Sequence, residues 1–389
     1  GVLDDIITMA ARRPIDDLDA EVRAVLRLGA YQLLHMRVPA HAAVHTTVDL
    51  VRAVAGQRIV GFVNAVLRAI GRQSWESWVE RVAPDDDMRR LAVATGYPEW
   101  LAAALADALG GDLDELRPAL SVDRPVTHLV ARPGRISRDE LLEQAGPGAV
   151  AGPWSPYAVR LAAGGDPGGL AAIRDGRAGV QDEGSQLVTL ALARADITAG
   201  ERWWADVCAG PGGKAALLTG LRPGATRLLA TDLHPHRARL VADAVRDDAG
   251  VVVADATRPA WRPDGFARVL LDAPCSGLGA LRRRPEVRWR RTPDDVERLH
   301  PLQLDLLRCA VDAAAPGGVV AYVTCSPHLR ESRDVVREVL STRTDARLDD
   351  ARPLFPGMPD LGPGPDVQLW PHRHGTDAMY LALVRRLPD

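Results

Sequence analysis

Lysine is almost absent from this chain of 389 residues. Lys and Arg together number 48, yet Lys214 is the single lysine, so arginine supplies the positive charge everywhere else. A planar guanidinium does not replace a compact ammonium group that has three rotatable donors. Lys214 closes a glycine-rich segment, DVCAGPGGK, that begins at Asp206. A lysine retained only at this turn indicates a functional loop, although a single occurrence is also compatible with chance.

Long apolar runs and closely spaced cysteines are missing too. No stretch of 18 apolar residues occurs and no basic and apolar leader opens the chain, so we expect a cytoplasmic protein without a membrane span. The four cysteines contain no C-x-x-C pair, which argues against a zinc site or a disulfide framework, and we assign no metal. A net charge of -3 neither indicates nor excludes a local RNA-binding patch.

The length and the globular composition predict two or three domains. Residues 1–83 carry helical apolar stripes over 18–36, 44–53 and 59–70, which predicts an all-α module. Residues 84–175 combine a helix over 99–109, a strand over 126–131 and a helix capped by Ser137, so we expect a small α+β subdomain.

Residues 176–389 alternate short apolar runs with helical stretches. Strands are expected over 203–208, 227–232, 251–254, 268–272 and 319–324. This rhythm predicts an α/β fold with a doubly wound, mostly parallel, Rossmann-like sheet. A helix is expected to start at Thr292-Pro293-Asp294-Asp295 and to stop at Pro316-Gly317-Gly318.

The glycine-rich segment has the pattern Gly210-x-Gly212-x-x-Ala215 between a predicted strand and a predicted helix. With Asp232 at the end of the next strand, this pattern suits an adenosine-containing cofactor and fits NAD as well as S-adenosylmethionine. A P-loop fits poorly, because Ala215 stands where that motif needs Ser or Thr. Asp255 ends another predicted strand and is expected in the same crevice, or else in a loop contact.

Two cysteines follow strands that end at this crevice. Cys275 lies in LLDAPCSG, three residues after Asp272, and Cys325 lies in AYVTCS. Cys208 and Cys309 are expected to be packing residues. Methylation of carbon 5 of a pyrimidine needs a nucleophile that first adds to carbon 6. A thiolate near a cation such as Lys214 suits this chemistry.

These motifs carry a resemblance to a known family. DVCAGPGGK, the TDL around Asp232, DAPCSG and TCS, preceded by VQDEGSQ over 180–186, resemble the Nol/Nop/Sun family of RNA cytosine-5 methyltransferases over about 180–389. LRLGAYQLLHM and GFVNAVLRAI resemble the NusB-like RNA-binding domain of the Sun-type bacterial members, which modify 16S ribosomal RNA. The helical module looks short at its start, so we expect it to be N-terminally truncated.

The resemblance implies roles for particular residues. Cys325 would be the nucleophile on a flipped cytosine and Cys275 would assist product release, while Asp272 would contact the base and Lys214 would support the reacting centre. DNA cytosine-5 enzymes use a Pro-Cys thiol as the nucleophile, so this division of roles rests on the resemblance alone. The residues implied for S-adenosylmethionine binding are Cys208, Ala209, Gly210, Pro211, Gly212, Gly213, Lys214, Asp232, Asp255 and Asp272.

A basic segment directly after DAPCSG is a candidate RNA-binding surface. It comprises Arg282, Arg283, Arg284, Arg288, Trp289 and Arg290, and Arg291 extends it. Two histidine pairs, His41/His45 near the start of a helix and His372/His374 in a predicted loop, are assigned no metal. The ending HGTDAMYLALVRR departs from the Asp-Gly-Phe-Phe strand common in the family, which puts its local packing in doubt.

The sequence leaves other functions possible. The helical module and the basic segment also suit a non-catalytic RNA-binding assembly factor. The glycine turn with Asp232 also suits a nicotinamide-dependent oxidoreductase, which would leave the paired thiols unexplained. No residue reads out the RNA, so transfer RNA and 23S ribosomal RNA remain possible substrates beside 16S ribosomal RNA.

Overall fold

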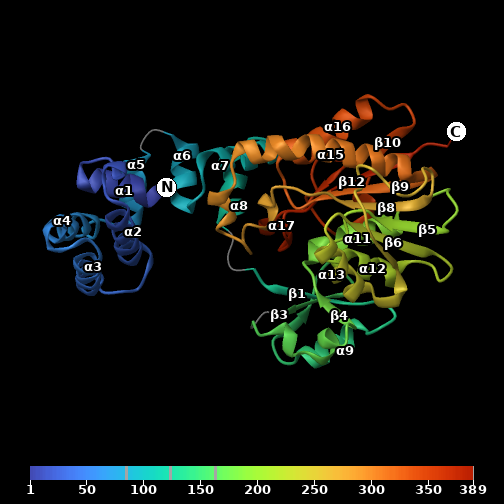
Figure 1. Ribbon diagram of the computed structural model, residues 1–389, viewed down its shortest axis with the longest axis horizontal. Helices are drawn as coiled ribbons and strands as arrows, with labels where there is room; N and C mark the ends of the chain where they lie inside the picture. The colour runs from blue at the N-terminus through green and yellow to red at the C-terminus, as the bar shows by residue number, and fades with distance from the viewer. Residues whose placement is uncertain (84–85, 122–124, 162–163, 389) are drawn as a thin grey trace. The chain divides into compact units, whose positions relative to one another are not determined.

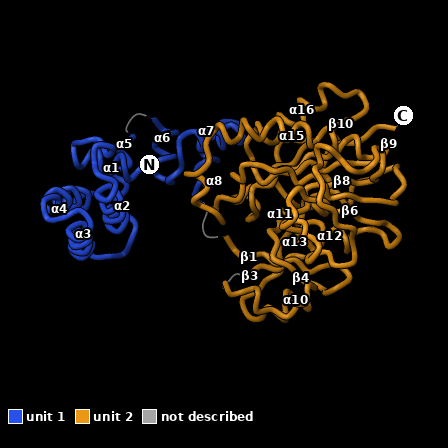
Figure 2. The backbone as a smooth tube through the Cα atoms, viewed as in Figure 1, with its two compact units in different colours: residues 1–121 blue, residues 122–389 orange. Residues whose placement is uncertain are grey.

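The computed structural model describes residues 1–83, 86–121, 125–161 and 164–388. It divides the chain into two compact units, Gly1–Ser121 and Val122–Asp389 (Figure 2). This division falls inside the segment 84–175 that the sequence suggested as one subdomain. The helices of that segment before residue 122 pack in the first unit, whereas its strands and the helices that accompany them belong to the second. The predicted division into three domains stays a prediction.

The first unit is built from helices, as its apolar stripes predict. They are α1 (Val2–Ala11), η1 (Ile15–Asp17), α2 (Ala20–His35), α3 (Ala40–Ala55), η2 (Gln57–Ile59), α4 (Val60–Ile70), α5 (Trp75–Val82), α6 (Asp87–Thr95), α7 (Glu99–Ala108) and α8 (Leu113–Leu120).

Close approach of three helices in this unit depends on a glycine. A Cβ atom on Gly29 of α2 would lie 2.7 Å from Leu67 of α4 and 2.8 Å from Thr47 of α3. Native packing leaves no room for such an atom without a shift of its neighbours. Gly29 therefore sets how tightly α2 packs against α3 and α4.

The second unit begins with a small antiparallel sheet in the order β2-β3-β1-β4. Its elements are β1 (Thr127–Ala131), α9 (Arg138–Ala145), β2 (Ala149–Ala151), β3 (Ala158–Leu161), η3 (Pro167–Gly169), α10 (Ala171–Arg174) and β4 (Ala178–Val180). The predicted cap is confirmed, because Ser137 Oγ accepts a hydrogen bond from the Glu140 N–H.

The large sheet follows with the order β10-β12-β9-β8-β5-β6-β7, and β11 pairs with β12. Pairs among β5, β6, β7, β8 and β9 are parallel, whereas β12 runs antiparallel to its neighbours. Its elements are α11 (Glu183–Arg194), β5 (Trp203–Asp206), α12 (Gly213–Leu221), β6 (Arg227–Asp232), α13 (Pro235–Val245), η4 (Arg246–Asp248), β7 (Gly250–Val253), β8 (Phe266–Asp272), η5 (Leu278–Ala280), α14 (Val287–Arg290), α15 (Pro293–Ala313), β9 (Ala314–Thr324), η6 (Leu329–Glu331), α16 (Arg333–Ser341), β10 (Ala346–Asp349), η7 (Arg352–Leu354), β11 (Val367–Gln368), α17 (Pro371–His374) and β12 (Tyr380–Arg386).

Helices cover both faces of this sheet, as Figure 1 shows for the second unit. Alternate residues of β8 point to opposite faces. Leu270 joins the core that contains residues of α11, whereas Val269 and Leu271 join the core that contains residues of α15 and α16. The sheet is thus doubly wound and mostly parallel, and the Rossmann-like prediction is confirmed.

One predicted helix end is wrong. The helix that starts after Thr292 ends at Ala313, and Pro316-Gly317-Gly318 lies inside β9. The pairing register with β8 shifts between Phe266 and Arg268, so a bulge accommodates the extra residues of the Pro-Gly-Gly segment. Among the described residues, no helix has the length and apolar character needed to cross a membrane.

Candidate active site

Two thiols meet at the carboxyl ends of neighbouring parallel strands. Cys275 follows β8 and Cys325 follows β9, and their Sγ atoms lie 3.4 Å apart. The hydrogen bond with Cys325, together with burial, raises the pKa of Cys275 well above its ordinary value. Cys275 therefore keeps its proton at neutral pH.

An ion pair lies in the same site. Lys214 Nζ, at the start of α12, is 2.7 Å from Asp272 Oδ2 at the end of β8. Burial alone would lower the pKa of Lys214, but the charge and the hydrogen bond of Asp272 outweigh it and raise that pKa. Lys214 is therefore a fixed cation. Burial, and then the charge of Asp272, raise the pKa of Asp206 to about 8.

A buried carboxylate ties the two cysteine loops together. Glu331, which is fully buried, accepts hydrogen bonds from the backbone N–H of Ser276 at 2.7 Å and from its hydroxyl group. The Ser276 hydroxyl lies 3.3 Å from that of Ser326. Gln303 of α15 donates to the carbonyl of Pro274 and to Glu331. Each serine directly follows one of the cysteines, so this network fixes the separation of the thiols.

Glycines shape the loop between β5 and α12. A Cβ atom on Gly210 would lie 2.4 Å from Asp232 Oδ2, and with glycine there the Gly210 N–H donates to that oxygen at 3.1 Å. Gly212 has a φ of +103°, a left-handed conformation that side chains disfavour, and caps α12. The N–H groups of Ala209, Gly210 and Gly212 donate within the protein, so a ligand at the positive end of α12 would meet the N–H groups of the first turn of that helix.

A cavity of about 320 Å³ joins these features. Its lining comes from the glycine loop, the ends of β8 and β9, and β1 with the segment from the end of β4 into α11. Residues at and just after η5, and residues just before β12, complete it. The lining residues are His128, Val180, Gln181, Asp182, Ser185, Ala209, Gly210, Pro211, Gly213, Lys214, Asp272, Ala280, Arg283, Cys325, Asp377 and Met379.

Two arginines of the basic segment are held inside this site. Arg282 and Arg283 each pair with both Asp182 and Asp377, at distances between 2.7 and 3.1 Å. The side chain of Arg282 is only 7% exposed. Arg282 is therefore buried by its ion pairs, whereas the Arg283 side chain is 28% exposed and lines the cavity. An RNA-binding role for these two arginines stays a prediction.

The rest of the basic segment is more accessible. The Arg284 side chain is 71% exposed and Trp289 is 51% exposed, and Arg290 is exposed as well, whereas Arg288 is half-buried. Arg291 donates to the Ser276 carbonyl and so also supports the Cys275 loop. An RNA-binding role for these residues stays a prediction.

Comparison with known proteins assigns the family. Residues 195–385 match the family described as 16S rRNA methyltransferase RsmB/F, and residues 1–72 match the NusB family. The ribosomal RNA small subunit methyltransferase B of Vibrio cholerae is 31% identical over 390 residues, covering 99% of this chain and 86% of that protein. The chain belongs to the RsmB/F family of 16S rRNA methyltransferases.

Other relatives agree with this assignment. A Mycobacterium tuberculosis H37Rv protein that carries a methyltransferase name is 50% identical over 394 residues, covering 100% of this chain and 85% of that protein. The crystal structure of PH0851 has a TM-score of 0.76 at 23% identity and covers 99% of this chain and 87% of that one. NSun6 from Pyrococcus horikoshii, determined with SFG, has a TM-score of 0.63 at 18% identity, with 75% and 99% covered. These two structures are similar in fold.

The RsmB/F methyltransferase uses S-adenosylmethionine, and the nicotinamide alternative is thereby set aside. The residues present fit this cofactor. The loop from Ala209 to Gly213 borders the cavity. A side chain at Gly210 would collide with the Asp232 carboxylate, so glycine lets the loop lie close to that residue. Asp232 is buried behind this loop and is not itself a lining residue; each of its oxygens accepts one backbone N–H, from Gly210 or from His234, and has a further lone pair. Its role in binding a ribose hydroxyl stays a prediction.

Several residues singled out from the sequence lie outside the cavity lining. Asp255 accepts hydrogen bonds from the N–H and the hydroxyl of Thr257, which is the loop contact left open above. Cys208 is not a lining residue, and burial raises its pKa, as suits a packing residue. Cys309 lies in α15 and points to the carbonyl of Thr257. His374 is buried in the short helix α17, so its assignment to a loop is wrong.

Other site residues were not found from the sequence. Gln181 and Asp182 lie in VQDEGSQ, a segment recognised only by its resemblance, and Asp377 lies in the ending that departs from the family pattern. His128 carries no sequence signal, because its place in the site depends on the pairing of β1 with β4. Glu331 likewise has no sequence signal, because its role depends on its contact with Ser276, 55 residues earlier in the chain.

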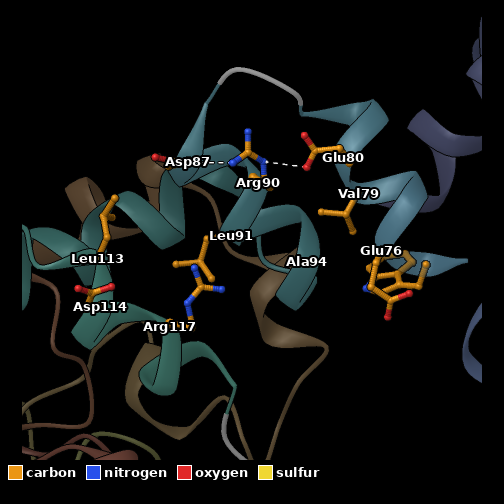
Figure 3. Close-up of a pocket in the computed structure, with 11 residues that line it drawn as sticks. Glu76, Val79, Glu80, Asp87, Arg90, Leu91, Ala94, Leu113, Asp114 and Arg117 are labelled. Atoms are coloured by element: carbon orange, nitrogen blue, oxygen red, sulfur yellow. Dashed lines mark hydrogen bonds and ion pairs between the residues drawn. The ribbon is translucent and has the colours of Figure 1, made fainter.

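A second cavity, of about 450 Å³, lies in the helical unit and is lined by residues of α5, α6 and α8 (Figure 3). Arg90 pairs there with Asp87 and Glu80, and Arg117 and Asp114 complete a mixed-charge lining. No thiol or histidine lines it. Its lining therefore lacks the thiols found beside Lys214.

Proposed function

We propose that this rRNA methyltransferase modifies carbon 5 of a cytosine in 16S ribosomal RNA through a covalent adduct between Cys325 and carbon 6. The observation that carries the proposal is the Cys325 thiol, which lines one cavity with Lys214 and Asp272 and lies 3.4 Å from the second thiol, Cys275. A buried pair of cysteines that serves only as packing would not need a fixed cation and a carboxylate at its side.

The steps follow from the chemistry of the base. The Cys325 thiolate attacks carbon 6, the new S–C bond forms, and the electrons of the carbon 5–carbon 6 double bond make carbon 5 nucleophilic. When bound, S-adenosylmethionine would supply an electrophilic methyl group, so that carbon 5 gains a C–CH3 bond as the sulfonium S–CH3 bond breaks and the neutral thioether would be left. Carbon 5 then loses its proton to a base as the S–C bond breaks, which restores the double bond and frees Cys325.

The other residues have supporting roles in this proposal. Lys214 holds positive charge beside the reacting centre, and Asp272 contacts the base while it fixes the lysine. Cys275 keeps its proton, which suits a group that assists elimination rather than a nucleophile. The cytosine must leave any helix to reach the cavity. Arg284, Arg288, Trp289 and Arg290 are proposed to hold the flanking RNA by charge and stacking.

Analysis of the product tests this proposal. Unmodified transcripts of 16S and 23S ribosomal RNA and of transfer RNA are incubated with methyl-labelled S-adenosylmethionine, and the nucleosides are separated by mass spectrometry. We expect label in 5-methylcytidine from 16S ribosomal RNA. Label in another nucleoside would contradict the carbon 5 chemistry, and label confined to 23S ribosomal RNA or transfer RNA would contradict the substrate.

A further inference from the structure

Two buried polar side chains line the active-site cavity without a role in the chemistry above. They are His128 at the start of β1 and Gln181 directly after β4, and they are 1% and 7% exposed. The β1–β4 register pairs Leu129 with Val180, and the Gln181 N–H donates to the His128 carbonyl at 3.0 Å. His128 and Gln181 are thus the next pair of the antiparallel ladder, so their side chains share one face of the small sheet.

The imidazole of His128 presents a hydrogen-bond donor. Its Nδ1 lies 2.9 Å from the Glu183 N and 3.3 Å from Asp182 Oδ2. The Glu183 N–H can only donate, and Asp182 Oδ2 already accepts from Arg282 and Arg283. Nδ1 is therefore the acceptor for Glu183, and the proton sits on Nε2. Among the described residues Nε2 has no hydrogen-bond partner.

The amide of Gln181 presents an acceptor beside this donor. Its Nε2 donates to Ser185 Oγ at 3.2 Å, and its Oε1 has no partner among the described residues. Buried polar groups without a partner are costly, so their retention in a cavity indicates a ligand that supplies the complementary groups.

The backbone under this pair is held rigidly. Gln186 of α11 donates to the carbonyls of Leu129 and Gln181, and its own Oε1 accepts from the Ser155 hydroxyl. Gln186 is fully buried. Anchoring both strands in this way fixes the spacing of the donor and the acceptor before any ligand arrives.

A donor next to an acceptor matches one pyrimidine and opposes the other. On the pairing edge of cytosine, N3 accepts and the N4 amino group donates, whereas on uracil N3–H donates and O4 accepts. We propose that His128 Nε2–H donates to N3, and that Gln181 Oε1 accepts from the N4 amino group, of the target cytosine. The pair would thereby select cytosine over uracil. This inference rests on the proposed function and identifies what makes the same site specific.

Variants that change one hydrogen bond at a time test the pair. His128→Asn keeps an acceptor for the Glu183 N–H but removes the Nε2 donor, and Gln181→Met removes the acceptor at similar volume. Exposed His236→Asn is the matched control. The modified cytosine is first mapped on 16S ribosomal RNA by bisulfite sequencing. Short RNAs then carry cytosine, 2-pyrimidinone, which lacks the amino group, or uracil at that position.

The measured quantity is kcat/KM on each RNA. We expect each variant to lose roughly 10- to 100-fold on cytosine RNA, because the lost partner leaves a base group unpaired. We expect Gln181→Met to lose no more than about twofold on 2-pyrimidinone RNA, which has no amino group for Gln181 to bind. The wild-type preference for cytosine over uracil should narrow in both variants, while His236→Asn matches the wild type.

The outcomes separate this inference from the function on which it rests. Equal loss by Gln181→Met on the cytosine and the 2-pyrimidinone RNA would mean a structural role and would overturn the inference alone. Unchanged kcat/KM in both variants would overturn it as well. A wild-type enzyme that forms no 5-methylcytosine would instead contradict the proposed function, and the inference would fail with it.

Discussion

At the scale of single residues, Lys214 and Asp272 determine the charge beside the thiols. The pair is 2.7 Å apart and the lysine side chain is 13% exposed, so solvent screens it little. In the proposed mechanism, a compact ammonium shares the cavity with a nucleophile and a base, and this chain, which uses arginine at its other basic positions, has lysine there. The single lysine is therefore explained by the site.

Replacing Lys214 by arginine tests this explanation. The guanidinium keeps the charge but is larger and planar, so it would enter the space of the base. We expect Lys214→Arg to lower the rate of methyl transfer about 100-fold with little change in thermal stability. Arg298→Lys, at a side chain that is 74% exposed, is the control for exchanging the two cations. A wild-type rate in Lys214→Arg would refute the need for an ammonium group.

Asp206 makes the stability of the fold depend on pH. Its folded pKa of about 8 lies above its ordinary value, so between about pH 4 and pH 8 the folded chain keeps a proton that the unfolded chain releases. The Asp206 contribution to the free energy of unfolding is full below pH 4 and is lost as the pH rises through this window.

Asparagine at position 206 removes this titration. Relative to the wild type, we expect Asp206→Asn to gain about 1–3 kcal/mol in the free energy of unfolding between pH 5 and pH 8. Urea denaturation at the two pH values measures it. A difference between variant and wild type that stays constant with pH would show that Asp206 ionises normally in the folded protein.

At the scale of elements, the two thiols lie on different loops, one after β8 and one after β9. β8 and β9 deliver Cys275 and Cys325 to the same edge of the sheet, and η6 supplies Glu331 to both loops through the serines. Neither strand determines the Sγ separation by itself. Glu331 is thus a positioning residue, which acts through Ser276 and Ser326.

Changing Glu331 should separate the thiols without touching the substrate. We expect Glu331→Met to lower kcat about 10- to 100-fold with little change in KM, whereas Glu331→Gln, which keeps an acceptor for Ser276, stays near the wild type. Mild oxidation with diamide offers a second readout, because disulfide formation between Cys275 and Cys325 requires their proximity. Loss of activity in Glu331→Met with unchanged disulfide formation would contradict a positioning role.

The sequence predicted the elements of this site better than their contacts. Local pattern and motif predict the positions of β5, β6, β7, β8 and β9 along the chain, the glycine loop, Lys214 and the paired cysteines. The Arg282 and Arg283 carboxylate pairs, the Glu331 network and His128 could not be predicted in this way. Each depends on segments far apart in the chain, whose approach is determined by tertiary packing.

At the scale of the whole molecule, the candidate active site and the residues matched to the NusB family lie in different units. The cavity, the glycine loop and both thiols lie within residues 122–389, which have hydrophobic cores of their own. The residues matched to the NusB family lie in the helical unit, with a separate core. Compact units with their own cores are able to fold alone.

Separating the units tests whether the second unit binds the cofactor and the helical unit contributes to RNA binding. We expect residues 122–389 alone to bind S-adenosylhomocysteine with a Kd within about twofold of the full chain, because the cofactor loop is complete in that unit. We expect the affinity for 16S ribosomal RNA to fall about tenfold or more, as measured by filter binding, because RNA contacts of the helical unit are lost. Unchanged RNA affinity would refute a binding role for the helical unit.

The central claim, that Cys325 attacks the base and Cys275 helps release it, is tested most directly by trapping. Wild type, Cys325→Ala and Cys275→Ala are each incubated with unmodified 16S ribosomal RNA and S-adenosylmethionine and separated on a denaturing gel. The account predicts that Cys325→Ala gives neither methyl transfer nor adduct, and that Cys275→Ala accumulates a covalent protein–RNA band. An adduct that survives in Cys325→Ala, or that vanishes in Cys275→Ala alone, would contradict the assigned roles.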